Sequence, residues 1–215
     1  MTKKIPSKRK YDSSRRKAQA QETQAQILSA AEELFIERGY TGTTIESIAQ
    51  KTGVALETVY SIFGNKRALL SRVVDMTVVG DGQPIPLLAR SYIQDVAAER
   101  DQTRQIQMFA KRIQLIMSRV APMFEVMRSA AKTEPEIAGI LKKYLNRRME
   151  GMNFFIECVT ANGSLRKSMD KQMAVETIWA LTSAEVYNLL RVDRGWSSDE
   201  YEYWLAETLI RLLLP

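Results

Sequence analysis

Two short helical segments separated by one glycine constrain the fold of this chain more than any other feature. The first runs to Thr52, and its apolar residues Ile45, Ile48 and Ala49 fall on one face. Gly53 follows, and glycine can adopt the left-handed conformation that ends a helix without steric cost. A second segment opens at once. The spacing therefore predicts two helices joined by a tight turn.

The residues around this turn indicate which side chains face inward and which face outward. Thr43, with Glu46 three residues later, predicts a capping box at the start of the first helix. In the second helix Val54, Val59, Ile62 and Phe63 are expected to pack on the first. The residues left at its start or outer face are Leu56, Glu57, Thr58, Tyr60 and Ser61. This is the outline of a helix-turn-helix motif, whose second helix enters a DNA major groove. The periodicity alone fits an ordinary helical hairpin equally well.

The flanking residues decide between these interpretations. Upstream, apolar residues recur at helical spacing from Ile27 to Phe35, and Arg38-Gly39-Tyr40 closes a third helix. The run from Ala30 to Leu70 resembles the amino-terminal domain of the tetracycline-repressor-like (TetR) family of bacterial regulators. The matching positions, in order, are Gly39-Tyr40, Thr43-Thr44, Ile48-Ala49, Gly53-Val54, Tyr60, Phe63, Lys66 and Leu69.

The resemblance implies phosphate contacts from Thr44, Tyr60 and Lys66, since hydroxyl and ammonium groups donate to phosphate oxygens. It also implies base-edge or groove contacts from the face between Ala55 and Ser61. The expected DNA-binding set in the motif is Thr43, Thr44, Ala55, Leu56, Glu57, Thr58, Tyr60, Ser61 and Lys66.

Two positions depart from the family pattern. Ala55 stands where a capping Ser is common, and Leu56-Glu57 stand where relatives often carry basic or amide residues. Leu suits a thymine methyl group, and Glu can accept from cytosine N4. Alternatively, Glu57 is a solvated first-turn carboxylate that the helix dipole favours. The operator sequence therefore cannot be read from these residues.

The amino-terminal extension is strongly basic. Residues 1–20 carry eight Lys or Arg and one acid, whereas the whole chain has a net charge of +6. The basic residues are Lys3, Lys4, Lys8, Arg9, Lys10, Arg15, Arg16 and Lys17. We expect this extension to neutralise phosphates or enter the minor groove, with Arg15, Arg16 and Lys17 nearest the motif. The alternative is a solubilising tail.

Composition argues against catalysis and against a membrane location. The chain has no histidine, one cysteine (Cys158) and no glycine-rich phosphate loop, so Ser-His and Cys-His arrangements and internal disulfides are excluded. We expect no catalytic residue, no metal and no cofactor. No apolar run approaches the length of a membrane span, and no signal peptide is indicated. The expected location is the cytoplasm of a bacterium, with nucleoid association when the protein is bound to its operator.

Beyond Leu70 the pattern stays helical, and no strand is predicted. Breaks are expected near Gly80–Pro86, Pro122, Pro135, Gly163 and Gly195, which separate about six further helices. A second capping box, Ser197 to Glu200, starts the last one. The predicted fold is all-α: a basic extension over 1–20, a three-helix DNA-binding domain over 21–68, and a larger helical ligand-binding and dimerisation domain over 69–215.

The carboxy-terminal region, from Trp179 to Leu213, resembles one large TetR subgroup more loosely. This implies a ligand cavity among the helices and a homodimer built from two long helices near 137–161 and 171–192. Methionines and aromatics suit an adaptable apolar pocket, although each such side chain on its own is more often plain core. Arg112, Arg119 or Arg128 could anchor a ligand carboxylate or lie on a solvated face. The candidate pocket is Met108, Phe109, Arg112, Ile116, Met123, Phe124, Met127, Tyr144, Met152, Phe155 and Trp179.

The predicted function is sequence-specific regulation of transcription by a homodimer. Its partners are double-stranded operator DNA, a second copy of itself and a small apolar or amphipathic inducer that releases it from the operator. One alternative is a TetR-like protein controlled by a protein partner, or an activator without an inducer. Another is a helical small-molecule-binding module or enzyme in which the helix-turn-helix is only scaffold.

Overall fold

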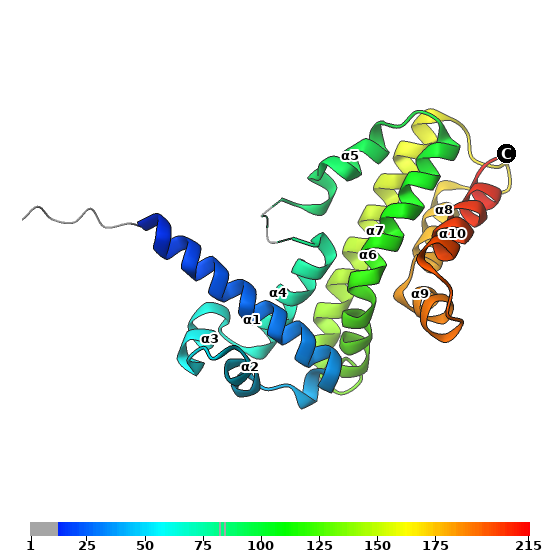
Figure 1. The fold of residues 1–215 in the computed structure, drawn as a ribbon. Helices are drawn as coiled ribbons and strands as arrows, with labels where there is room; N and C mark the ends of the chain where they lie inside the picture. Colours follow the sequence, from blue (N-terminus) through cyan, green and yellow to red (C-terminus); the bar gives the residue numbers. More distant parts are fainter. Residues whose placement is uncertain (1–12, 82, 84) are drawn as a thin grey trace, which may run out of the picture.

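The computed structural model describes residues 13–81, 83 and 85–215, and within them the chain is helical with no strand (Figure 1). This confirms the all-α prediction. The elements are α1 Ser13–Gly42, α2 Ile45–Thr52, α3 Leu56–Phe63, α4 Lys66–Val79, the 3-10 turn η1 Leu87–Ala89, α5 Ser91–Ala98, α6 Gln102–Ala130, α7 Pro135–Asn162, α8 Lys171–Leu181, α9 Ala184–Asn188, the π-helical turn η2 Leu189–Asp193, and α10 Ser198–Leu213.

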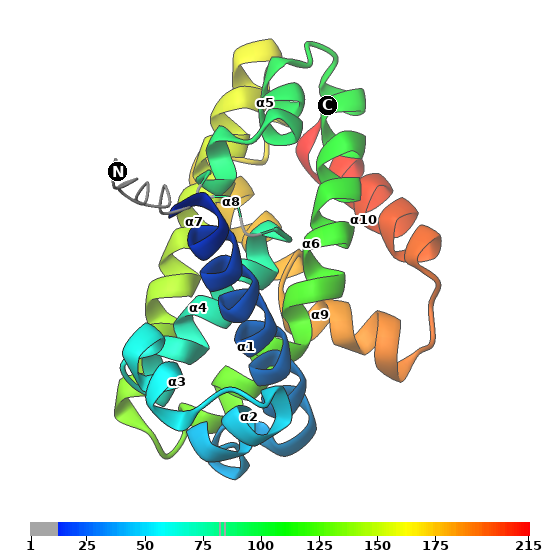
Figure 2. The same cartoon turned by 60° about the vertical axis from the view of Figure 1, so that its left-hand side comes forward.

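The two longest helices of the regulatory part, α6 and α7, lie side by side and form its spine (Figures 1 and 2). Helices α1, α2 and α3 form the end of the molecule that the sequence predicts to bind DNA, called the DNA-binding end below, and α4 leads from that end onto α6. On the other side of the spine α8, α9 and α10 pack against α6 and α7. No helix in the described part of the chain is both long and apolar enough to cross a membrane.

A kink in α1 sets the geometry of the DNA-binding end. Gly39 has φ 69° and ψ 176°, a left-handed φ that glycine tolerates, and the last turn of α1 changes direction there. Thr43 is then fully buried, and its hydroxyl lies 2.9 Å from both the Leu34 and the Gly39 carbonyl oxygens, to which it donates.

The predicted capping box is therefore displaced by one residue. Thr44, not Thr43, caps α2, and its partner is Ser47, not Glu46. The Ser47 amide donates to Thr44 Oγ1 (3.1 Å), and the Thr44 amide donates to Ser47 Oγ (3.2 Å). Gly53 ends α2 with φ 69°, as the sequence predicts.

Two predictions about the larger part are wrong. Pro122 does not break a helix, because α6 runs through it from Gln102 to Ala130. The buried neighbours Ala121, Met123 and Phe124 hold this stretch in the core, which offsets the hydrogen bond that proline removes. The second error is the long helix expected over 171–192. It is interrupted after Leu181, because Ser183 Oγ accepts from the Val186 amide and starts α9.

Candidate nucleic-acid interface

Helix α3 is seated on α2 and α4 by a narrow apolar stripe. Val59 and Phe63, four residues apart, are buried, and Val54 before the helix is half-buried. Ile62, which the sequence predicts to pack inward, is 38% exposed, because it lies off the stripe that Val59 and Phe63 define. Only a few side chains of α3 are needed to hold it, so most of its surface remains free.

The outward face of α3 presents the residues that the sequence predicts. Glu57, Tyr60 and Ser61 are exposed, Tyr60 by 44%, and Leu56 and Thr58 are half-buried. Ala55 is the N-cap and provides no side-chain cap. The first amides of α3 therefore lack a side-chain acceptor, and helix N-termini of this kind attract phosphate oxygens.

Helix α2 is held against α1 by an exposed ion pair. Lys51 Nζ lies 2.6 Å from Glu33 Oε2, and this pair lowers the pKa of Glu33. Thr44 is exposed at the start of α2 and is available to a phosphate, as expected. Thr43 is the exception in the predicted set. Its side chain is fully buried and bonded to α1, so it shapes the site and does not face DNA.

Lys66 has a structural role that the sequence did not predict. Its Nζ donates to the carbonyl oxygens of Tyr40 (2.9 Å) and Thr43 (3.0 Å) and lies 4.1 Å from the centre of the Tyr40 ring. Burial lowers its pKa. A Lys ammonium has three N–H donors, so one remains for a phosphate. Lys66 thus joins the start of α4 to the turn that precedes α2.

Sequence reasoning missed two polar residues at this end. Asn65 caps α4, because its Oδ1 accepts from the Ala68 amide at 2.9 Å, and Gln50 is exposed on α2. Asn followed by a helical run is a recognised start signal, so the first could have been found from the sequence.

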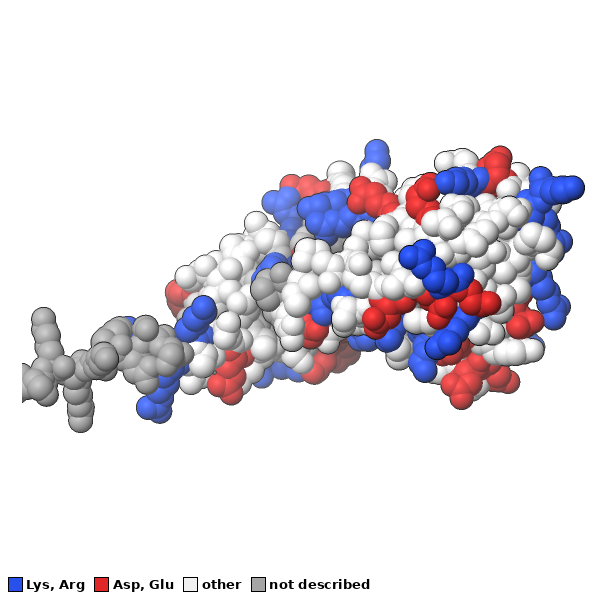
Figure 3. Space-filling model, turned by 90° about the horizontal axis from the view of Figure 1, so that it is seen from above, with Lys and Arg blue, Asp and Glu red and all other residues white. Residues whose placement is uncertain are grey.

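The basic extension is partly helical. Arg15, Arg16 and Lys17 are exposed in the first turns of α1, and between residues 15 and 26 no side chain of α1 is buried. This half of α1 projects from the body, and basic side chains stand beside the grey amino-terminal residues in Figure 3. The other predicted basic residues, Lys3, Lys4, Lys8, Arg9 and Lys10, lie outside the described residues.

The predicted pocket residues gather in the core of the regulatory part, where α6, α7 and α8 pack together. The Phe109 and Phe155 rings stack with their centres 3.8 Å apart. The buried members are Phe109, Met123, Phe124, Met127, Tyr144, Met152 and Phe155, and the half-buried ones are Met108, Arg112, Ile116 and Trp179. The apolar members belong to the core that runs through the molecule, and the role of the set as ligand contacts stays a prediction.

The three arginines considered as anchors already have partners. Arg112 lies over the Tyr92 ring, 5.0 Å from its centre. Arg119 Nε donates to the Thr77 carbonyl oxygen (3.2 Å) near the end of α4, and Arg128 pairs with Glu185.

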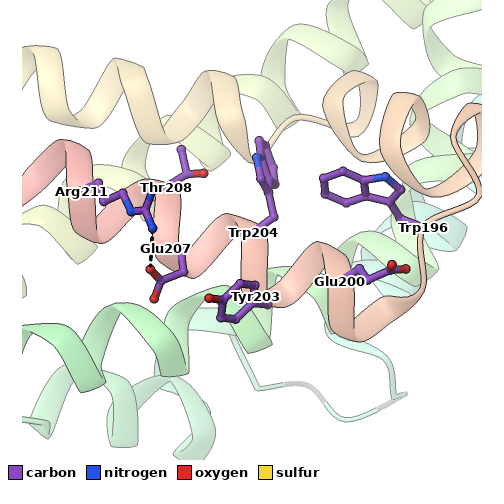
Figure 4. Close-up of a pocket in the computed structure, with 7 residues that line it drawn as sticks. All are labelled: Trp196, Glu200, Tyr203, Trp204, Glu207, Thr208 and Arg211. Atoms are coloured by element: carbon purple, nitrogen blue, oxygen red, sulfur yellow. Dashed lines mark hydrogen bonds and ion pairs between the residues drawn. The ribbon is translucent and has the colours of Figure 1, made fainter.

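A surface groove of about 500 Å³ runs along α10 (Figure 4). Trp196 and Trp204 lie edge to face in it, with ring centres 6.0 Å apart, and Tyr203 is 69% exposed. None of the predicted pocket residues lines it. The groove is an aromatic outer surface and not an interior cavity.

Comparison with known proteins agrees with this arrangement. Residues 27–73 match the model of the family "Bacterial regulatory proteins, tetR family". The regulator TtgR of Pseudomonas putida is 44% identical over 61 residues, which span 28% of this chain and 29% of TtgR. The match to this curated relative therefore spans less than a third of its length.

Solved structures extend the likeness in fold to most of the chain. NalD, the secondary repressor of the MexAB-OprM multidrug efflux pump in Pseudomonas aeruginosa, superposes with a TM-score of 0.66 at 22% identity, covering 91% of this chain and 98% of NalD. SmeT in its triclosan complex gives 0.69 at 17% identity, covering 90% and 92%. Residues 27–73 are therefore an amino-terminal domain of the tetR family of bacterial regulatory proteins, and the likeness of the rest of the chain to these structures is one of fold.

Proposed function

We propose that this protein is a sequence-specific regulator of transcription that binds operator DNA as a homodimer. The observation that carries the proposal is the seating of α3. The buried side chains of this helix are Val59 and Phe63, and it turns Glu57, Tyr60 and Ser61 outward at the exposed end of the molecule. A short helix presented in this way fits a major groove.

Contacts to the DNA backbone would come from both sides of α3. Thr44 at the start of α2 and Tyr60 on α3 offer hydroxyl groups, and Lys66 offers its third N–H. Arg15, Arg16 and Lys17 extend the basic surface along α1. These contacts would position the protein, and Leu56, Glu57 and Thr58 would read base edges.

A second copy is required because one recognition helix reads only a few base pairs. Two-fold pairing places two such helices in successive major grooves, about 34–36 Å apart. In the described residues the exposed large apolar side chains of the carboxy-terminal half include Met173 on α8 and Leu212 on α10. They favour α8 and α10 as the pairing surface over α7, on which no exposed large apolar side chain is described.

The proposed control is release by a small ligand. NalD is named a repressor, and SmeT is solved with triclosan, so proteins of this fold include a repressor and a ligand-bound regulator. In this chain α6 contacts both the DNA-binding end and the helices α9 and α10. Some ligands would fit the regulatory part better when the α3 helices of the two subunits are not spaced to enter successive major grooves. Such a ligand would lower the affinity of the dimer for the operator.

A binding assay with the protein's own upstream intergenic DNA tests the proposal. We expect retention that competitor DNA of random sequence does not remove and that weakens steeply with salt. Tyr60→Phe should weaken binding about tenfold or more, because one hydrogen bond to a charged group is lost. The matched control Tyr203→Phe, on exposed α10, should leave binding unchanged. Equal affinity for random duplex would overturn the proposal.

A further inference from the structure

The regulatory part contains a cluster of buried hydrogen-bond donors with too few acceptors. The cluster lies where α8 packs on α7 and α10, and its central members are Arg148, Trp179 and Tyr201. Arg148 Nη2 donates to the Trp179 carbonyl oxygen and to Thr182 Oγ1 (3.1 Å). The Arg148 guanidinium also lies over the Trp179 ring, 5.1 Å from its centre.

Three donors of this cluster have no partner among the described residues. They are Arg148 Nε–H, the Trp179 indole N–H and the Tyr201 hydroxyl, and all three atoms are buried. Tyr201 is 0% exposed, and its ring packs against Tyr187 and Trp204, with ring centres 5.0 and 5.9 Å away. Most buried polar groups in native proteins are paired, so three unpaired donors in one place indicate a missing acceptor.

The charges of the cluster are also unbalanced. Arg148 is influenced by Arg128 and by Glu185, and Glu185 already pairs with Arg128. Two guanidinium groups therefore share one carboxylate. Burial, the largest cause, lowers the pKa of Arg148 to about 10, so the group is still charged at neutral pH. A second negative group would bring the cluster to neutrality.

The arrangement selects the kind of acceptor. A carboxylate accepts through two oxygens and suits a guanidinium together with hydroxyl and indole donors. Met152 and Tyr187 are buried beside the cluster, Met152 with its Sδ 4.0 Å from Thr182 Oγ1. Apolar walls of this kind favour a ligand whose remaining part is an uncharged organic chain and not a second charged group. The Arg128–Glu185 pair, with side chains 39% and 46% exposed, marks the side of the cluster that faces solvent.

We propose that this cluster binds the carboxylate of an amphipathic organic monoacid. Arg148 anchors the carboxylate, and the Tyr201 hydroxyl and the Trp179 indole N–H complete its coordination. This inference rests on the proposed function in one respect, because it names the chemical class of the proposed regulatory ligand. The binding itself is measured without DNA. The competing explanation is that Arg148 serves only to hold the carbonyl groups at the end of α8.

The test is calorimetric titration of the full chain with matched acids and alcohols. The probes are straight-chain monocarboxylates from butyrate to decanoate with the corresponding alcohols, and benzoate with benzyl alcohol. We expect at least one acid to bind tenfold or more tightly than its alcohol. Tyr201→Phe should weaken that acid about tenfold, since one hydrogen bond to a charged group is lost. Arg148→Met should abolish the preference for acid over alcohol.

Two matched variants serve as controls. Tyr203→Phe removes an exposed hydroxyl two residues from Tyr201, and Arg112→Met removes a guanidinium that lies over the Tyr92 ring, outside the cluster. Both should bind the acid like the unaltered protein. If Arg148→Met does not fold, Tyr201→Phe decides alone, because it removes a single oxygen atom.

Three results would overturn the proposal: no acid binds, acid and alcohol bind equally, or the Tyr201 and Arg148 variants retain the affinity of the unaltered protein. If Arg148→Met were less stable but bound the acid as the unaltered protein does, the role of Arg148 would be only to hold the carbonyl groups at the end of α8. Failure of the proposed function is distinguishable, because it appears as loss of specific DNA retention while acid binding persists.

Discussion

At the scale of single residues, the adjacent Thr43 and Thr44 have different roles. Thr43 is buried and donates to two backbone carbonyl groups of α1, whereas Thr44 is exposed and caps α2. Thr43→Val keeps the shape and removes the donor, so we expect the free energy of unfolding to fall by about 1–3 kcal/mol. Urea denaturation measures this. Operator affinity, measured well below the melting temperature, should stay within about twofold, since the change removes a single buried hydroxyl.

Thr44→Val provides the comparison. Loss of the cap should cost about 1 kcal/mol, and operator binding should weaken because an exposed hydroxyl is removed. An unchanged stability of Thr43→Val, or a loss of operator affinity as large as that of Thr44→Val, would contradict the assignment.

The sequence could not separate these two threonines. Thr43 is followed three residues later by Glu46, which matches the usual capping-box pattern, and Thr44 is followed by Ser47, whose hydroxyl can accept in the same way. The left-handed φ of Gly39 decides between them, because it turns the chain so that Thr43 enters the interior. Local spacing predicts the cap to within one residue, and tertiary packing determines which hydroxyl remains outside.

At the scale of helices, the capping box of α10 is the prediction that the structure reproduces in detail. The Ser197 amide donates to Glu200 Oε2 (2.7 Å), and the Glu200 amide donates to Ser197 Oγ (3.2 Å). Ser197→Ala should lower the free energy of unfolding by about 1 kcal/mol, measured by urea denaturation. The donation from Ser197 also lowers the pKa of Glu200 below its ordinary value of 4.5.

The pH dependence of this box follows from the lowered pKa. The stabilisation by Glu200 is present above pH 4.5 and is lost as the pH falls through the lower folded pKa, where the carboxylate becomes protonated. The stability difference between the unaltered protein and Glu200→Gln should therefore be largest near neutral pH and shrink below pH 4.5. Denaturation at a series of pH values tests this, and a difference that grows in acid would refute it.

Pro122 shows where sequence rules fail for an element. Proline lacks the amide that would bond one turn back, yet α6 continues through it. Burial of the neighbouring residues holds the helix in place of the missing hydrogen bond. Replacing the proline should therefore restore the free energy that it costs. We expect Pro122→Ala to raise the free energy of unfolding by up to about 3 kcal/mol, measured by urea denaturation. A loss of stability would show instead that α6 depends on the proline at this position.

The amino-terminal part of α1 gives a prediction about salt. Replacing Arg15, Arg16 and Lys17 by Gln should reduce the slope of log K against log salt for operator binding by about 0.9 for each phosphate that the protein no longer neutralises. The control replaces three exposed lysines of the regulatory part, Lys111, Lys142 and Lys143, and should leave the slope unchanged. Equal slopes for all three proteins would assign the basic residues to solubility alone.

At the scale of the whole molecule, the DNA-binding end could be predicted from the sequence in detail, whereas for the regulatory part the helices could be predicted but the contacts between distant residues could not. Residues 27–73 carry a local pattern of turns, caps and apolar stripes, and neighbours in sequence are neighbours in space. The donor cluster instead joins Arg148 to Trp179 and Tyr201, which are 31 and 53 positions away in the chain. No periodicity encodes such a pairing, and Arg148 is absent from the predicted pocket for that reason.

The two halves are joined by hydrogen bonds to α4. Tyr144 of α7 donates to the Ser71 carbonyl oxygen and to Asp75 Oδ1, both at 2.9 Å, and Arg119 of α6 donates to the Thr77 carbonyl oxygen. Burial, followed by the charge of Asp75, raises the pKa of Tyr144, so its hydroxyl stays a donor. Gly80 permits the close approach of Arg119, because a Cβ there would lie 2.8 Å from the guanidinium carbon.

These hydrogen bonds predict how the binding of operator DNA to α1–α3 affects α6 and α7. When operator DNA binds, we expect slower amide hydrogen exchange in α1–α3 and, through α4, in α6 and α7. The double variant Tyr144→Phe/Arg119→Met should confine the slowing to α1–α3, because it removes the side-chain bonds that tie the spine to α4. The control Tyr203→Phe/Arg211→Met makes the same chemical changes on exposed α10 and should behave like the unaltered protein. Slowing of α6 and α7 in both double variants would place the coupling in the packing of α1 on α6, which neither variant touches.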